Sequence, residues 1–341
     1  MSNFRTALSF DDVLLVPKHS SVLSRKYIDI SSNLGKNKYE LPIMSSPMDT
    51  VTESEMVACM DKSGGLGIIH RYNSIDDQVR LAVEATNKGA MHVAAAIGVS
   101  GDYEERSQEL YCSGGRTLCI DIAHGHHKMM RDAIQKLRKM YGDTVSIIAG
   151  NVATLEGFEF LADSGADAIR VGVGGGSICS TRIQTGHGIP TLQSVIDCAM
   201  SDRDTVIIAD GGIKNSGDAV KALAAGADFI MLGSVLSGAD ETPGDFLVDA
   251  KGDQRKIYRG MASREAQRSW RNKVSSVEGV STTVAAKGKA EKILADFSWG
   301  IRSGLSYSGC SSLAEFRSRS EFIIQTSAGM HESSTHIMST Q

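Results

Sequence analysis

The chain has 341 residues, of which 41% are hydrophobic and 22% charged, and its formal net charge is −4. These values are typical of a globular protein with one large domain or two ordinary ones. The weak negative charge gives no reason to expect a nucleic acid or a membrane as a partner. No apolar run approaches the length of a membrane span, the N-terminus lacks a signal-peptide core, and the six cysteines include no CxxC pair. We therefore expect a cytoplasmic protein, and nothing suggests a zinc site or a disulfide scaffold.

Eight short apolar runs recur along the chain, each followed by a polar or amphipathic segment. Continuous apolar runs of this length suit the strands of a parallel sheet that is buried on both faces. The expected strands cover 41–46, 66–70, 92–98, 117–123, 145–151, 168–173, 206–212 and 229–234. The expected helices cover 76–88, 127–141, 155–164 and 216–225, the last stopped by Gly226. Eight β/α units in about 200 residues predict one α/β domain over residues 1–341, a TIM (β/α)8 barrel.

The connection after the sixth strand is enlarged. Strand starts are spaced by roughly 23 to 28 residues, but 38 residues separate Ala168 from Val206. The surplus holds a loop with four glycines in the five residues 172–176, followed by Cys179 and Thr181. In this fold the loops after the strands build the active site, so Cys179 is a candidate nucleophile with a hydroxyl within possible reach. The alternative is a structural loop that carries a bystander thiol.

Polar residues end several of the apolar runs at the same rim. Asp121, Asn151 and Asp210 stand at such ends. Gly211–Gly212 and Gly233–Ser234 match the phosphate-binding corner of these barrels, where free amides hold a phosphate dianion without a lysine. Asp210, in front of that corner, is a suitable acceptor for a ribose diol, and together these features predict a nucleotide monophosphate. The alternative is two glycine turns that merely pack well.

Two segments after the barrel are polar. Residues 251–289 are charged and poor in apolar periodicity, and a long polar excursion near a barrel mouth indicates a mobile flap. The alternative is a solvated surface loop. Residues 327–341 are expected to form a mobile tail unless a neighbouring subunit anchors them. His124 and His187 have no metal-type partner pattern, so we interpret both as structural.

In this order, the motifs resemble those of one known family, that of inosine-monophosphate dehydrogenase and guanosine-monophosphate reductase. The likeness covers nearly the whole chain. The matching segments are 8–17, 48–53, 121–126, 149–154, the cysteine loop, 209–213 and 258–261.

The resemblance implies a role for each matching residue. The implied catalytic residues are Cys179, which as a thiolate forms a covalent thioimidate at C2 of the purine, together with Thr181 and Glu278. The implied substrate-binding residues are Ser46, Met48, Ser177, Asp210, Gly211, Gly212, Gly233, Ser234, Tyr258, Gly260, Met261, Ala262, Ser263 and Gly279. The implied cofactor-binding residues are Ser24, Arg25, Arg71, Asp121, Ile122, Ala123, Asn151, Arg170, Gly172, Val173 and Gly174. A potassium-like ion is implied at the carbonyls of Gly174, Gly176 and Cys179, with Arg182 nearby and Glu332 arriving from a neighbouring chain.

Three features favour the reductase over the dehydrogenase. The dehydrogenase usually carries a pair of CBS domains after the second strand, and here one helix leads from that strand to residue 92, leaving no room for CBS domains. The dehydrogenase flap has an Arg-Tyr pair that activates water, whereas this flap offers Arg268-Ser-Trp270 and Arg271-Asn272. The reductase instead pairs the threonine of its Cys-x-Thr loop with a flap glutamate, and Thr181 and Glu278 match those positions.

Other segments are more like the dehydrogenase, namely 121–126, 301–309 and 328–333, and Arg71 stands where the family commonly has a lysine. An arginine is a cation but cannot give up a proton. The sequence favours a GMP reductase that uses NADPH to convert GMP to IMP and ammonia, as a homotetramer or an octamer. The alternatives are an IMP dehydrogenase without CBS domains, which oxidises IMP to XMP with NAD, and a purine-nucleotide-binding barrel without catalysis. No GxGxxG follows the first strand, which excludes a Rossmann site.

Overall fold

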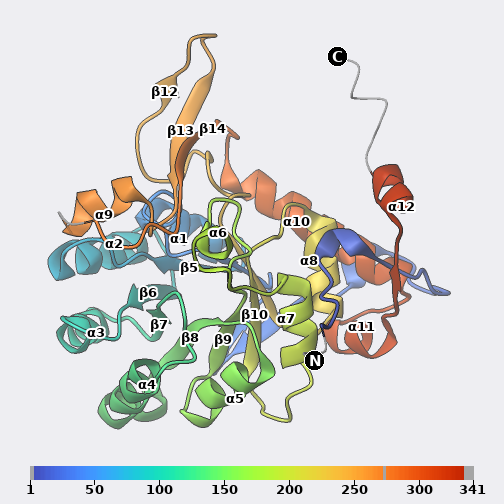
Figure 1. The fold of residues 1–341 in the computed structure, drawn as a ribbon, viewed down its shortest axis with the longest axis horizontal. Helices are drawn as coiled ribbons and strands as arrows, with labels where there is room; N and C mark the ends of the chain where they lie inside the picture. The colour runs from blue at the N-terminus through green and yellow to red at the C-terminus, as the bar shows by residue number, and fades with distance from the viewer. Residues whose placement is uncertain (1–3, 272–273, 334–341) are drawn as a thin grey trace.

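The computed structural model describes residues 4–271 and 274–333. Within these residues, eight parallel strands form a closed barrel and follow one another around it in chain order (Figure 1). The barrel strands are β4 (Ile43–Ser45), β5 (Leu66–Ile69), β6 (Val93–Ile97), β7 (Thr117–Asp121), β8 (Ser146–Val152), β9 (Ala168–Val171), β10 (Val206–Asp210) and β11 (Phe229–Leu232). Each strand overlaps one of the eight apolar runs, so the predicted TIM barrel is confirmed.

Helices cover the outside of the barrel, one after each strand (Figure 1). They are α1 (Ser54–Lys62), α2 (Ile75–Asn87), α3 (Tyr103–Cys112), α4 (Lys128–Tyr141), α5 (Leu155–Asp163), α7 (Thr191–Cys198), α8 (Ser216–Ala224) and α10 (Ala290–Tyr307). The four predicted helices, now α2, α4, α5 and α8, are correct to within one residue at each end. Helix α10 packs against both α8 and α1, so it closes the ring although the flap separates it from β11.

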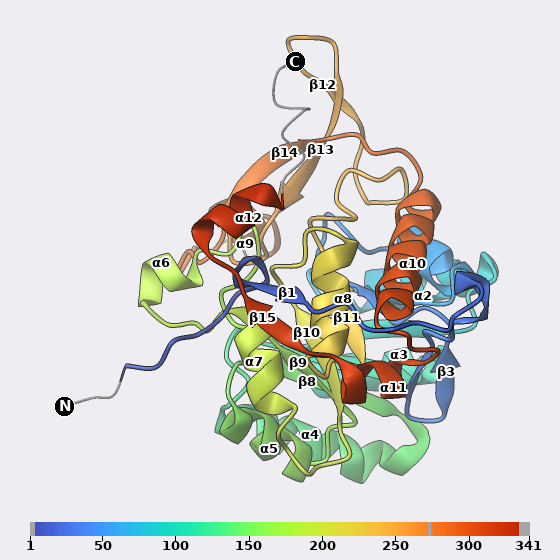
Figure 2. The same ribbon diagram turned by 90° about the vertical axis from the view of Figure 1, so that its right-hand side faces the viewer.

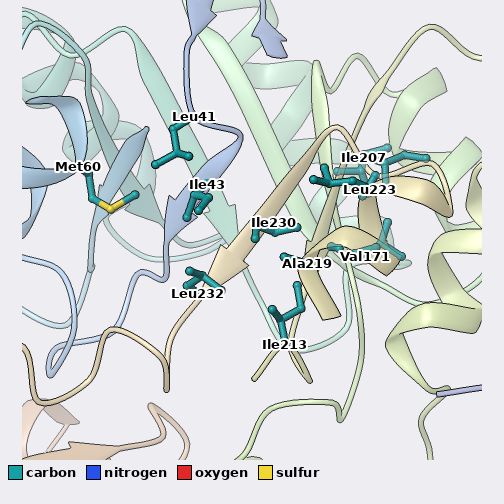
Figure 3. Close-up of a cluster of buried hydrophobic side chains, with 14 of the residues drawn as sticks. Leu41, Ile43, Met60, Val171, Ile207, Ile213, Ala219, Leu223, Ile230 and Leu232 are labelled. Atoms are coloured by element: carbon teal, nitrogen blue, oxygen red, sulfur yellow. The ribbon is translucent and has the colours of Figure 1, made fainter. Parts of the chain in front are cut away.

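The core has two layers because side chains alternate across each barrel strand. The inner layer fills the barrel with Met44, Leu66, Ile68, Ala94, Ala96, Cys119, Ile148, Ala168, Ile208, Phe229 and Met231. The outer layer lies between strands and helices. Figure 3 shows part of it, where Ile230 lies between Ile43 of the neighbouring strand and the α8 residues Ala219 and Leu223. The interior is therefore packed with side chains, and a ligand has room only at an end of the barrel.

A hairpin packs into the N-terminal end of the barrel. Its strands are β2 (Ser32–Leu34) and β3 (Asn37–Tyr39), and Leu34 and Tyr39 belong to the inner layer. The Tyr39 ring meets the ring of Phe229, the first residue of β11, edge to face at a centroid distance of 5.7 Å. The hairpin therefore plugs this end, which leaves the opposite end for function.

The segment expected as a polar flap has regular structure. Strands β12 (Leu247–Val248), β13 (Gln254–Arg259) and β14 (Ser281–Ala285) form an antiparallel sheet that projects beyond the barrel at the top of Figure 1. Helix α9 (Arg264–Arg271) lies between β13 and β14 in the sequence. The sequence analysis missed these elements because β13 and β14 stabilise each other by pairing, with Tyr258 opposite Thr282, and are only weakly apolar on their own.

The two ends of the chain meet on the outside of the barrel. Strand β1 (Val13–Leu15) pairs antiparallel with β15 (Phe322–Ile324), as Figure 2 shows. The remaining elements are the 3-10 turns η1 (Phe10–Asp12), η2 (Arg25–Tyr27) and η3 (Gly142–Thr144) and the helices α6 (Thr181–Thr185), α11 (Leu313–Arg319) and α12 (Ser327–Glu332). The predicted mobile tail therefore begins as a helix, and its part from residue 334 onward lies outside the described residues.

The inner layer makes Phe229 a test of the barrel core. Phe229→Ala removes a fully buried ring and leaves a cavity, so we expect the free energy of unfolding to fall by about 3–5 kcal/mol. Urea unfolding followed by circular dichroism measures the loss. The control is Phe4→Ala, because Phe4 is 97% exposed and its truncation should change little. Equal midpoints for the two variants would contradict the assignment of Phe229 to the core.

Candidate active site

A cavity of about 300 Å³ opens at the C-terminal end of the barrel. The carboxyl ends of parallel strands meet at this rim, which brings side chains from distant parts of the chain together. The cavity is lined by Ser46, Pro47, Met48, Tyr72, Asp121, Ile122, Ala123, Asn151, Arg170, Gly172, Val173, Gly174, Gly175, Gly176, Cys179, Thr181, Asp210, Gly211, Met261, Ala262 and Glu278. Larger hollows, such as one of about 640 Å³ beside Asn37 and His92, lie elsewhere and contain none of the candidate catalytic residues.

The glycine loop presents Cys179 to this cavity. At Gly172 the backbone has a φ of 144°, and a Cβ there would lie 2.0 Å from the carbonyl oxygen of Asp210. Only glycine lets the chain leave β9 so close to the end of β10. Gly174 also has a positive φ, of 78°, and packs against the side chain of Arg182. The loop ends at a partly exposed Cys179, so the predicted nucleophile lies in the cavity.

A line of hydrogen bonds runs from the thiol to the flap. The Cys179 Sγ donates to Thr181 Oγ1 at 3.2 Å, and Thr181 Oγ1 donates to Glu278 Oε2 at 2.8 Å. Backbone contacts join the same two segments, because the amide of Ser180 donates to the carbonyl of Glu278 at 3.0 Å and Cys179 forms a β-bridge with Gly279. A nucleophile, a hydroxyl and a carboxylate in hydrogen-bond reach are suited to move a proton at a covalent site.

Two carboxylates on the opposite wall share one buried arginine. Arg170, 7% exposed, donates to Asp121 Oδ1 at 2.6 Å and to Asp210 Oδ2 at 2.8 Å. Asn151, which lies at a register irregularity in β8, donates to the same Asp210 oxygen at 2.7 Å. Burial alone would raise the pKa of Asp121, but the positive charges of Arg170 and Arg71 outweigh it and the pKa is lowered. Among the described residues, Asp210 Oδ1 accepts no hydrogen bond and is left for a ligand.

The predicted phosphate corner borders the cavity. Ser177, Gly212 and Ser234 line a neighbouring hollow of about 250 Å³. Lys214 also lines it, paired with Asp11 at 2.7 Å, so this corner holds a cation that the sequence analysis did not name. A Cβ on Gly233 would lie 3.2 Å from Ser46 Oγ, 3.3 Å from the Tyr258 hydroxyl and 3.4 Å from Met48 Sδ. These predicted substrate residues therefore converge on one point.

The base of the flap packs on the cysteine loop. A Cβ on Gly260 would lie 3.4 Å from the carbonyl oxygen of Ile178, and the amide of Val280 donates to that carbonyl at 3.0 Å. Arg259 donates to Asp49 Oδ2 from Nε at 3.0 Å, which ties the end of β13 to the loop after β4. The flap thereby brings Met261 and Ala262 to the cavity.

An aromatic pair closes one side of the mouth. Tyr72 meets Trp270 of α9 edge to face at 4.9 Å, and its hydroxyl donates to Asp121 Oδ2 at 3.4 Å. Beside it, Arg71 donates to the backbone carbonyl of Asp121 at 3.1 Å. Its buried Nε makes no hydrogen bond in the described part of the chain but forms an ion pair with Asp121 Oδ2 at 3.7 Å. The sequence analysis named Arg71 but missed Tyr72, whose only signal is its place directly after Arg71.

Three predicted residues lie away from this cavity in the single chain. Ser24 and Arg25 lie at η2, which packs against α10. Glu332 ends α12, and no ion pair joins it to Arg182 within residues 4–271 and 274–333.

Over the same residues, no three His, Cys, Asp or Glu side chains are grouped to hold a metal ion. No helix in the described part of the chain is long and apolar enough to cross a membrane.

The chain matches the IMP dehydrogenase / GMP reductase domain over residues 7–336. It is 33% identical to the inosine-5'-monophosphate dehydrogenase of Nitrosopumilus maritimus (strain SCM1), with 98% of both chains covered, and 31% identical to the GMP reductase of Leishmania major, with 97% of both covered. Its fold matches a cysteine-to-alanine variant of the Trypanosoma brucei GMP reductase in complex with guanosine 5'-monophosphate. That match has a TM-score of 0.93, 30% identity and 98% coverage of each chain.

The fold, the cavity and these relatives define an oxidoreductase of a class that uses a nicotinamide cofactor. More particularly, the chain belongs to the IMP dehydrogenase/GMP reductase family. Relatives of both kinds are longer than this chain, because the alignments extend over 471 positions for the dehydrogenase and 478 for the reductase, against 341 residues here. The lack of an inserted segment in this chain therefore does not distinguish a reductase from a dehydrogenase.

The paired carboxylates make stability depend on pH. Asp121 has a lowered pKa in the folded chain, so its ionised form stabilises the fold above the ordinary Asp pKa of about 3.9, and this contribution is lost as the pH falls through the folded value. We expect the urea midpoint of the wild type to fall relative to that of Asp121→Asn as the pH is lowered from 6 to about 2.5. Asp204→Asn, at an exposed position, is the control. A difference that stays flat with pH would contradict the ion pairing.

Proposed function

We propose that the protein is a GMP reductase, which converts GMP and NADPH to IMP, ammonia and NADP. The observation that carries the proposal is the line Cys179–Thr181–Glu278, with hydrogen bonds of 3.2 and 2.8 Å. The thiolate of Cys179 attacks C2 of the purine, an electron-poor carbon between two nitrogens, and forms an S–C2 bond. The C2–N bond to the amino group then breaks. An amine leaves well only when protonated, and Thr181, polarised by Glu278, delivers that proton.

The other walls of the site position the nucleotide. Asp210 Oδ1 accepts hydrogen bonds from the ribose hydroxyls while Arg170 and Asn151 hold its other oxygen. The phosphate lies at the corner of Ser177, Gly212 and Ser234, where backbone amides and Lys214 offset its charge. On the flap, Met261 and Ala262 lie beside the cavity where the base would stack. The contacts with the ribose and the phosphate thus position C2 of the purine next to the thiol of Cys179.

The residues on the other side of the cavity fit a nicotinamide cofactor. Asp121, Asn151 and Gly172 offer acceptors and donors for a ribose and a carboxamide, and the guanidinium of Arg71 beside Asp121 would attract an anionic phosphate. NADPH, when bound, would supply the hydride that replaces the lost amine at C2, and cleavage of the C2–S bond would then free Cys179 and release IMP. Arg71 holds charge here and moves no proton, because a guanidinium stays protonated. Tyr72 and Trp270 exclude water from this side.

The second candidate is an IMP dehydrogenase, and the 33% identity to the Nitrosopumilus maritimus enzyme favours it. That reaction runs the hydride in the other direction and ends with hydrolysis, which needs a base that activates water. The dehydrogenase has an Arg-Tyr pair in its flap, and this chain has Arg271-Asn272 there. Asn272 lies outside the described residues. The hydrogen bond of 2.8 Å between Thr181 and Glu278 supports proton delivery to a leaving amine, and we therefore rank the reductase first.

The assembly and its ion complete the proposal. Ser24, Arg25 and Glu332 are distant from the cavity of their own chain, which supports a homotetramer or octamer in which a neighbouring copy supplies them. The carbonyls of Gly174, Gly176 and Cys179 are the ligands we propose for a monovalent cation such as K+. The Gly176 carbonyl already accepts from the Cys179 amide at 3.1 Å and keeps one lone pair for the ion.

The covalent step makes turnover depend on the thiol. Cys179→Ala should abolish GMP-dependent oxidation of NADPH, read from the absorbance of the reduced nicotinamide. Binding of GMP, measured by isothermal titration calorimetry, should persist because the corner and Asp210 are intact. Cys112→Ala, an exposed cysteine on α3, should keep full activity. Turnover by Cys179→Ala at the wild-type rate would overturn covalent catalysis.

The carboxylate of Glu278 separates the two members of the family. Glu278→Gln keeps the size and the hydrogen-bond reach but carries no transferable proton, so GMP turnover should fall by about 10²–10⁴-fold. Glu109→Gln on α3 is the matched control. The wild type and Glu278→Gln are each assayed with GMP plus NADPH and with IMP plus NAD. Production of XMP by the wild type without GMP-dependent NADPH oxidation would replace the reductase with the dehydrogenase.

A further inference from the structure

A glutamine buried beneath the flap has no role in the proposed chemistry. Gln267 lies on α9 and is only 3% exposed, although a primary amide is strongly polar. Burying such a group is unfavourable unless its hydrogen bonds are satisfied. Its neighbour Ala266 is fully buried, so an apolar side chain would suit the position for packing alone. The contacts of the amide therefore indicate what it does.

The Gln267 amide joins the two segments that flank α9. Its Nε2 donates to the carbonyl of Ala262 at 3.0 Å and to the carbonyl of Ser276 at 2.7 Å. Its Oε1 accepts from the backbone amide of Ser275 at 2.8 Å and from the Ser275 hydroxyl at 3.1 Å. One side chain thereby fixes the backbone before the helix and the backbone that returns from it.

The returning segment carries Glu278. Ser276 Oγ donates to Glu278 Oε1 at 3.2 Å, while Thr181 donates to the other carboxylate oxygen. The amide of Glu278 donates at 3.1 Å to the same Ala262 carbonyl that Gln267 holds. Both the backbone and the carboxylate of Glu278 are thus one contact away from the buried amide.

We propose that Gln267 is a positioning residue that sets the Glu278 carboxylate against Thr181, and through Thr181 against the thiol of Cys179. The Gln267 amide contacts none of these three residues directly and acts by fixing Ser275, Ser276 and Ala262. The inference rests on the proposed function for the meaning of the Thr181–Glu278 pair. Displacing a catalytic carboxylate by about 1 Å can lower the rate strongly, so the rate depends on the residue that holds the carboxylate in position.

The test is Gln267→Met, which keeps the length of the side chain and removes its hydrogen bonds. We expect kcat to fall roughly ten- to a hundredfold with KM for the nucleotide within about threefold, because the nucleotide-binding walls are elsewhere. Gln108→Met, at an exposed position on α3, is the matched control. Ser276→Ala, at an exposed position, is a second variant that removes only the contact to Oε1 and should lower kcat severalfold. A wild-type kcat in folded Gln267→Met would overturn the proposal.

A double-mutant cycle separates positioning from general support of the flap. If Gln267 acts through Glu278, adding Gln267→Met to Glu278→Gln should change the remaining rate by less than about twofold. A second full loss of rate in that background would overturn the proposal. Production of XMP by the wild type without GMP-dependent NADPH oxidation would reject the proposed function, and the crystallographic comparison of the Thr181–Glu278 hydrogen bond would then test the positioning by Gln267 on its own.

A readout independent of activity is the geometry itself. Crystal structures of wild type and Gln267→Met should differ in the hydrogen bond between Thr181 Oγ1 and Glu278, present in the first and broken in the second. An intact bond in the variant would overturn the proposal even if its kcat were low.

Discussion

A charge buried at the mouth of a barrel must be neutralised by its neighbours, and Arg170 meets this requirement with two carboxylates from the strands β7 and β10. Because Arg170 itself belongs to β9, the two ion pairs tie three strand ends together at the rim. They fix Asp121 and Asp210 before any ligand arrives, and the positive charge of Arg170 helps to lower the pKa of Asp121. Removing the guanidinium would leave two carboxylates facing each other in a poorly solvated cavity. The arrangement of the two walls that we propose for the nucleotide and the cofactor depends on this one cation.

Among the residues that the structure describes, the barrel places no carboxylate in hydrogen-bond contact with the Cys179–Thr181 pair. Glu278 comes from the flap, 97 residues after Thr181, and reaches it only because the flap base pairs with the cysteine loop. An opening of the flap would therefore break the hydrogen bond between Thr181 and Glu278. In the proposed function, this would link access of the substrate to the assembly of the catalytic residues. The buried Gln267 fits the same logic, since it stabilises the part of the flap that carries the carboxylate.

In our proposal, a reductase and a dehydrogenase share the covalent step and differ in what leaves or enters at C2. The chain is similar to named members of both kinds, at 33% and 31% identity, so overall identity says little about the member. We rank the reductase first because Thr181 and Glu278 form a hydrogen bond of 2.8 Å, which suits proton delivery to a leaving amine.

The sequence by itself determined the barrel, because strands buried on both faces must be continuous apolar runs and the helices between them must be amphipathic. It also placed Cys179, Asp121 and Asp210 at one rim, since the carboxyl ends of parallel strands meet there. The pairing of β13 with β14, the contact of Tyr72 with Trp270 and the amide contacts of Gln267 came only from the tertiary structure. Weakly apolar strands and single polar side chains carry no periodic signal, because their stability comes from partners distant in sequence. No local sequence pattern shows which distant polar groups come into contact, because these contacts form only when the flap packs on the barrel.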